Sequence, residues 1–153
     1  MKTRTVVLTL ALCLLGLAVS LAQNPSMGTW KLNEAKSKFS SGATKNTTVV
    51  YSPAGDNTLV TTDGTTGDGK PAHTEWTGKF DGKDYPLTGD PSADSRSYKV
   101  INPHTMEFAN KKDGKVTTSG KIVVSPDGKS RTVTVSGALA GTKVTSTAVY
   151  DKQ

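Results

Sequence analysis

The stretch Lys129-Ser130-Arg131-Thr132-Val133-Thr134-Val135-Ser136 sets apolar and polar side chains in alternation. Val133 and Val135 fall on one face of an extended chain, and the hydroxyl side chains fall on the other. Because side chains alternate between the two faces of a β-strand, this stretch predicts a strand with one buried and one solvated face. The branched β-carbons of Val and Thr favour the same conformation.

The same alternation recurs along the chain, in 73–80 and 143–150 among others. The sequence Asp-Gly-Lys occurs four times between such runs, and Asp-Gly favours tight hairpin turns because glycine tolerates a positive φ. A short helical turn is expected at 33–39, with Asn33 as its cap, and a loop at 89–94. We predict strands at 28–32, 46–52, 57–65, 71–80, 84–88, 95–101, 104–111, 115–124, 130–137 and 143–151.

Sequential strands joined by tight turns form a meander, which must close on itself or fold into two packed sheets to avoid open edges. Short connections favour the up-and-down arrangement. The fold class expected is therefore all-β, an antiparallel up-and-down barrel of about eight to ten strands, with a two-sheet sandwich as the alternative.

Residues 1–22 have the composition of a secretory signal peptide. Lys2 and Arg4 precede an apolar run, and Ser20-Leu21-Ala22 supplies the small residues of a cleavage site, so cleavage is expected after Ala22. Cys13, the one cysteine, would leave with this segment, and the mature chain would contain no disulfide. We therefore expect a secreted or periplasmic protein with one domain over 23–153 and no membrane span after cleavage.

Loss of Lys2 and Arg4 lowers the formal net charge from +6 to +4. The remaining lysines are scattered, whereas a nucleic-acid site calls for a dense basic patch with interleaved aromatic residues. We expect no nucleic-acid partner, and we expect a monomer.

The segment Gly28-Thr29-Trp30-Lys31-Leu32-Asn33, followed by Lys36-Ser37, resembles the first strand of lipocalins and the wider calycin group. It is most similar to small secreted lipocalin-like bacterial proteins, a group of uncharacterised function, and 73–78 and 149–152 fit the same group. The resemblance implies a barrel with a ligand cavity, in which Trp30 plugs the closed end and a basic side chain stacks over it. Lys152 and Arg131 are both candidates for that basic residue. The chain lacks the Thr-Asp-Tyr motif, the disulfide and the C-terminal helix that lipocalins often carry.

Arg96 and Arg131 are the two arginines outside the signal peptide, and each is in phase with apolar neighbours. A guanidinium facing a lumen can bind a carboxylate through two parallel hydrogen bonds. The pairing of Arg96 with Tyr98 resembles the headgroup site of fatty-acid-binding proteins. The alternative is that both arginines lie at strand ends, where their heads reach water or pair with Asp or Glu.

Large aromatic side chains would line the lumen or simply fill it, and the sequence leaves both possibilities open. The predicted ligand-binding residues are Arg96, Tyr98, Arg131, Trp76, Tyr51 and Phe108.

Catalytic and metal chemistry have little support in the sequence. No nucleophile motif is present, no Cys or His cluster offers a zinc site, and 90–94 does not match a calcium loop. His73 and His104 are expected at the surface, although one histidine could ligate haem iron. We expect no cofactor, no metal and no enzymatic activity.

The first hypothesis is a lipocalin-like protein that binds a small hydrophobic or amphipathic ligand in the barrel lumen. The alternative is a structural or interaction protein of the cell envelope, with a filled barrel and no small-molecule ligand. An enzyme or haem carrier on the same scaffold is a third hypothesis.

Overall fold

The computed structural model describes residues 24–153, and the predicted signal peptide lies outside this range. The strands are β1 (Gly28–Leu32), β2 (Lys38–Phe39), β3 (Lys45–Ala54), β4 (Asn57–Thr65), β5 (Pro71–Gly78), β6 (Asp81–Thr88), β7 (Ser95–Asn102), β8 (Thr105–Lys112), β9 (Lys115–Val124), β10 (Ser130–Leu139) and β11 (Thr142–Lys152). One 3-10 turn, η1 (Glu34–Lys36), separates β1 from β2.

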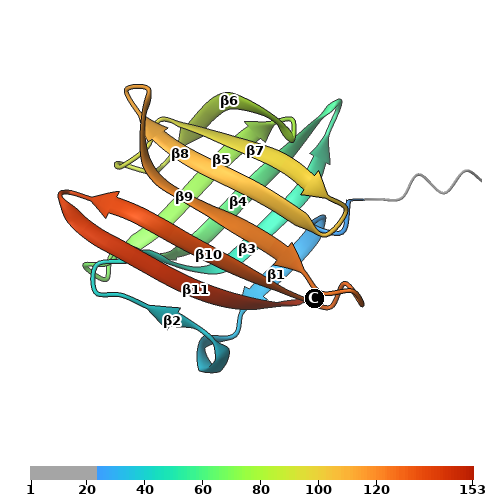
Figure 1. Ribbon diagram of the computed structural model, residues 1–153, viewed down its shortest axis with the longest axis horizontal. Coiled ribbons are helices and arrows are strands. Elements are labelled where there is room, and N and C mark those ends of the chain that lie inside the picture. The colour runs from blue at the N-terminus through green and yellow to red at the C-terminus, as the bar shows by residue number, and fades with distance from the viewer. Residues whose placement is uncertain (1–23) are drawn as a thin grey trace, which may run out of the picture.

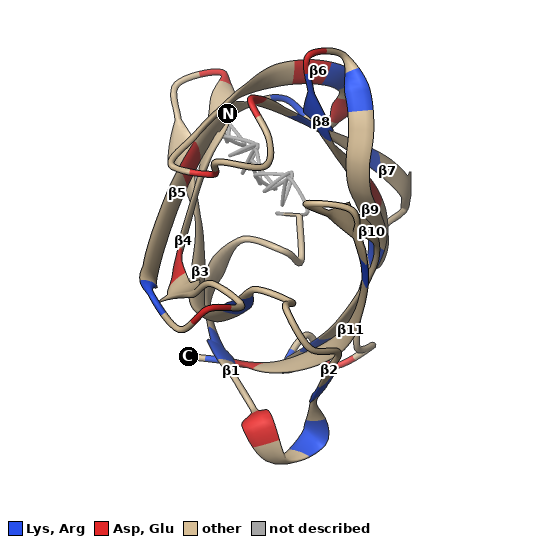
Figure 2. Cartoon of the chain, turned by 90° about the vertical axis from the view of Figure 1, so that its left-hand side faces the viewer, with Lys and Arg blue, Asp and Glu red and all other residues tan. Residues whose placement is uncertain are grey.

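Ten of these strands form a closed antiparallel barrel (Figure 1). Each strand from β3 to β10 pairs with the next along the chain, and β1 pairs with both β3 and β11. The β1–β11 pairing aligns Trp30 with Lys152 and Leu32 with Tyr150, which leaves the ring without an open edge. Seen along its axis, the barrel is a continuous ring of strands around one interior (Figure 2). The predicted barrel is confirmed, and the sandwich alternative is excluded.

The expected helical segment at 33–39 is shorter in the structure. Asn33 caps η1 through its side-chain oxygen, which accepts a hydrogen bond from the Lys36 amide. Beyond Ser37 the chain returns to the barrel, where the two residues of β2 pair with β11 at Ser146 and Thr147. Strand pairing along β11 therefore ends the helical turn after three residues.

The Asp-Gly-Lys sequences include one exception to the expected hairpins. Those at 68–70, 113–115 and 127–129 lie at connections between strands, as predicted. The one at 81–83 begins β6, where the register against β7 shifts between Asp81 and Asp84 and Gly82 has a φ of 82°. There the positive φ of glycine forms a β-bulge within a strand.

Alternation along each strand places the core inside the ring. The buried apolar side chains come from all parts of the barrel wall: Trp30, Val49, Tyr51, Val60, Trp76, Leu87, Tyr98, Met106, Phe108, Ile122, Val124, Val144, Ala148 and Tyr150. Two inward glycines relieve crowding, because a Cβ at Gly120 would lie 2.0 Å from the Thr134 carbonyl oxygen and one at Gly137 would lie 2.1 Å from that of Thr117. These close approaches let β9 and β10 bend around the interior.

Trp30 is fully buried and belongs to this core. We predict that Trp30→Ala lowers the free energy of unfolding by about 3–5 kcal/mol, because it empties the space of a large core side chain. Urea denaturation measures the change. Lys31→Ala is the matched control on the outer face of the same strand and should alter it by less than about 0.5 kcal/mol. Equal effects of the two variants would contradict a structural role for Trp30.

Candidate functional site

The barrel encloses a cavity of about 410 Å³. Its lining reaches from buried wall residues to the loops at one end of the barrel, namely 40–44, 66–70 and 89–92. Trp30 lies buried at the other end and does not belong to the lining. The cavity is therefore open at the loop end and closed at the Trp30 end.

Trp30 fills the closed end of the barrel with its buried ring and forms one hydrogen bond there. Its indole Nε1 donates to the carbonyl oxygen of Ser26 at 2.7 Å, which ties the segment before β1 across this end. Both basic side chains proposed to cover Trp30 do so, since the Arg131 Cζ lies 4.7 Å and the Lys152 Nζ 5.2 Å from its ring centroid. The sequence left these two candidates open, and the structure uses both.

Arg131 carries a buried positive charge into the cavity. Its side chain lies against three rings, with Cζ 4.7 Å from the centroid of Trp30, 5.0 Å from that of Tyr51 and 4.9 Å from that of Tyr150. The residue is 2% exposed, and its Nε and Nη1 have no hydrogen-bond partner among residues 24–153. Cation–π contacts of this kind stabilise a guanidinium but leave its donors unused. Unused donors on a buried charge carry a free-energy cost that an anionic ligand would remove.

Arg96 is also buried, at 8% exposure, and is held by neutral partners. Its Nε donates to the Asn110 Oδ1 at 2.5 Å, and its Nη1 donates to the Tyr98 hydroxyl at 3.1 Å. Asn110 in turn donates from Nδ2 to the Thr118 hydroxyl at 2.9 Å. Each arginine is the second residue of its strand, β7 or β10, as the alternative interpretation expects. Both are buried, however, and neither forms an ion pair with Asp or Glu in residues 24–153, so their heads do not reach water or an acidic partner as that alternative requires.

Five of the six predicted ligand-binding residues line the cavity: Tyr51, Arg96, Tyr98, Phe108 and Arg131. Trp76 does not line it. Its ring lies parallel to that of Phe80, with centroids 6.1 Å apart, and its Nε1 donates to the Arg96 carbonyl oxygen at 2.9 Å. Trp76 therefore packs the wall beside the cavity and helps to position Arg96.

Polar lining residues were missing from the sequence-based set. Asn110 and Thr118 complete the network around Arg96, and the hydroxyls of Thr62 and Thr74 lie 2.7 Å apart in a buried hydrogen bond. Each is in phase with inward apolar residues of its own strand, so period-two alternation was the available signal. The alternation did not identify them as lining residues, because Asn and Thr side chains are ordinarily exposed to solvent.

Two tyrosines of the cavity, Tyr51 and Tyr150, remain un-ionised at neutral pH. Burial raises the pKa of Tyr150 from 10.0 to about 12 and raises the pKa of Tyr51 further, although Arg131 opposes the shift in both. Desolvation outweighs the attraction because the phenolate is the charged form of tyrosine. Both hydroxyls therefore keep their protons and do not neutralise the arginines, and that of Tyr150 donates to the Asn46 carbonyl oxygen at 3.0 Å.

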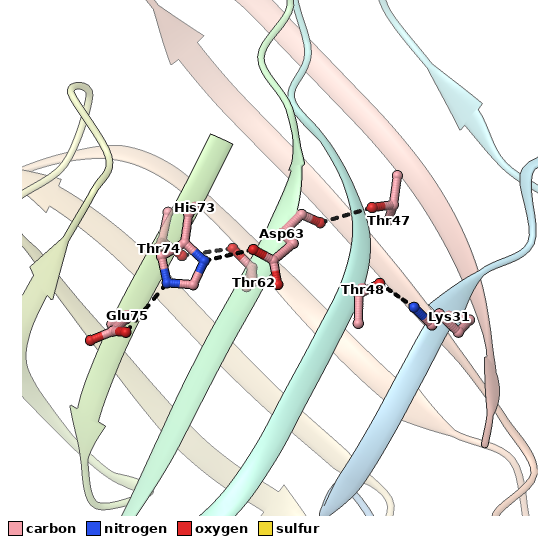
Figure 3. A network of polar contacts seen from close by, with 8 residues as sticks. All are labelled: Lys31, Thr47, Thr48, Thr62, Asp63, His73, Thr74 and Glu75. Atoms are coloured by element: carbon pink, nitrogen blue, oxygen red, sulfur yellow. Dashed lines mark hydrogen bonds and ion pairs between the residues drawn. The ribbon is translucent and has the colours of Figure 1, made fainter. Parts of the chain in front are cut away.

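His73 lies on the outside of the barrel, as predicted (Figure 3). Its Nδ1 lies 2.6 Å from the Asp63 Oδ1 and its Nε2 lies 3.3 Å from the Glu75 Oε1. The hydrogen bond to Asp63, supported by Glu75, raises the pKa of His73. His104 lies exposed in the turn between β7 and β8. Within residues 24–153, no group of three or more His, Cys, Asp or Glu side chains could hold a metal ion.

No helix in the described part of the chain is long and apolar enough to cross a membrane. No family model matches the sequence, and no curated protein matches it. Among solved structures, the chain is similar to one described as "Structure of EF1p2_mFAP2b bound to DFHBI", with a TM-score of 0.44 and 14% identity over 84% of this chain and 94% of that one. The fold assignment follows from the strand pairing of the chain itself.

The raised tyrosine pKa values predict a loss of stability in alkali. A tyrosine whose pKa is raised by folding stabilises the folded state fully below its ordinary pKa of 10.0, and that contribution disappears as the pH rises toward 12. Unfolding free energy measured by urea denaturation should therefore fall across this range. Tyr150→Phe, which cannot ionise, should reduce the fall. Phenolate absorbance from all four tyrosines near pH 10 with the fold intact would contradict the prediction.

Proposed function

We propose that this chain is a secreted or periplasmic binding protein that takes a small amphipathic molecule into its barrel and performs no catalytic step. The observation that carries the proposal is the buried Arg131 guanidinium, whose Nε and Nη1 have no partner in the described part of the chain and lie beside a cavity of about 410 Å³. A filled barrel would leave no such space.

The lining suits a ligand with an apolar body and a polar end. Val133, Val135, Val144 and Ala148 offer apolar surface, and removal of apolar ligand area from water contributes about 25 cal/mol per Å². The Nε and Nη1 of Arg131 offer donors for an oxygen-bearing end. Sites for small molecules are typically apolar cavities with a few such polar groups.

The haem-carrier possibility lacks the ligand it needs. His73 is held by Asp63 and Glu75 outside the barrel, and His104 is exposed in a turn, so neither imidazole projects into the interior. The envelope-protein alternative remains the outcome that a negative binding experiment would favour.

Binding should be visible in the fluorescence of Trp30, because its ring contacts Arg131. Trp76→Phe leaves Trp30 as the one remaining tryptophan. We expect decanoic acid to change the emission of this variant in a saturable titration. We expect Arg131→Met to weaken that binding by about ten- to a hundred-fold, since charge-assisted hydrogen bonds contribute about 1.5–3 kcal/mol.

Lys99→Met is the matched control, because it removes one positive charge from an exposed position on the outer face of β7. It should leave the affinity unchanged. Circular dichroism and thermal melting should show Arg131→Met to be folded and at least as stable as the parent, since it replaces a buried unpaired charge with an apolar side chain. The proposal would be overturned if decanoic acid caused no change in tryptophan emission and an organic extract of the purified protein contained no small molecule.

The proposed localisation has its own test. Expression of the full chain in a bacterial host should release a soluble protein whose mass corresponds to a start at Gln23, because the signal peptide is expected to be cleaved after Ala22. Ala22→Asp, which places a charge at the cleavage site, should block processing. Recovery of the intact chain from the cytoplasm would contradict the secreted or periplasmic assignment.

A further inference from the structure

The charges inside the cavity do not balance. Arg96 and Arg131 are the charged side chains of its buried wall, and the acidic residues of the described lining are Asp68 and Asp90, both in the loops at the open end. Asp68 pairs with Lys70 at 2.8 Å, and Asp90 accepts hydrogen bonds from Ser92. The deep part of the cavity therefore has two positive charges and no described carboxylate.

The neutral partners of the arginines cannot correct this imbalance. Asn110 and Tyr98 accept hydrogen bonds from Arg96 without carrying charge. Burial keeps the Tyr51 and Tyr150 hydroxyls protonated, so neither of them supplies a phenolate. Water in the cavity can solvate a guanidinium but cannot neutralise it, and each uncompensated buried charge has a desolvation cost.

The two guanidiniums extend from different parts of the barrel wall. Arg96 is on β7 and Arg131 is on β10, with β8 and β9 between them. The side chains then approach the same pair of rings, with the Arg131 Cζ 5.0 Å from the Tyr51 centroid and the Arg96 Cζ 5.7 Å from the Tyr98 centroid. The two ring centroids are 6.2 Å apart.

We propose that the ligand of this cavity is a small organic diacid, with two anionic groups separated by a short apolar frame. One acidic group binds Arg131 at the closed end, the other binds Arg96, and the frame lies along the Tyr51–Tyr98 pair. This inference rests on the proposed function and narrows its ligand class, because a monoacid would balance one buried charge and leave the other.

The test compares ligands of equal length and different charge. The probes are decanol, decanoic acid and decanedioic acid, with the diacid series extended from hexanedioic to dodecanedioic acid to find the length that fits. Isothermal titration calorimetry measures each affinity. We expect the best diacid to bind about ten- to a hundred-fold more tightly than the monoacid of the same length, which is the contribution expected from a second charge-assisted contact.

Two variants separate the interior site from general attraction to a basic protein. Arg96→Met should reduce diacid affinity to that of the monoacid, whereas Lys99→Met, which loses an exposed charge from the same strand, should preserve the advantage. The advantage should also persist in high salt, because buried pairs are screened far less than exposed ones.

Each remaining outcome has a definite meaning. If the monoacid binds and no diacid binds more tightly than it does, the diacid inference is overturned and the proposed function stands. The same conclusion follows if the diacid still binds more tightly than the monoacid in Arg96→Met. Failure of every probe to bind the parent protein overturns both.

Discussion

Closure of the ring by β1 and β11 is the constraint on which the interior depends. The pairing of Trp30 with Lys152 joins the first strand to the last and gives every strand of the ring two neighbours. Once the ring is closed, parity along a strand determines whether a side chain contacts solvent or the enclosed space. The same pairing brings the closed-end plug, Trp30, beside Arg131 on the neighbouring wall.

The interior combines two kinds of packing that differ in their effect on the stability of the barrel. Around Trp76, aromatic rings fill the wall. The rings of Tyr85 and Tyr98 lie edge-on to the indole, with centroids 5.7 and 4.8 Å from its centroid. Around Arg131, rings contact a cation, and no described residue gives its Nε or Nη1 a hydrogen-bond partner. The first arrangement stabilises the barrel, whereas the second leaves a buried charge with unused donors, which has a free-energy cost. Such unsatisfied polar groups in an otherwise complete core are typical of binding sites.

Sequence patterns predicted the fold more completely than the candidate site. Alternation and Asp-Gly turns located all ten strands of the ring, because both depend on local geometry. They did not locate β2, whose two residues are held by long-range pairing with β11. At the site, Arg131 was found because it shares the phase of Val133, but Asn110 and Thr118 were missed. Their burial depends on hydrogen bonds to partners on other strands, which one strand's sequence does not contain.

The plug at Trp30 has a consequence for kinetics. A cavity with one opening has a single path for entry and exit, so a bound molecule must leave through the end at which it entered. Release would then require the innermost group to part from its guanidinium before the molecule can begin to withdraw. Residence time would consequently be governed at the bottom of the barrel, far from the loops where encounter takes place.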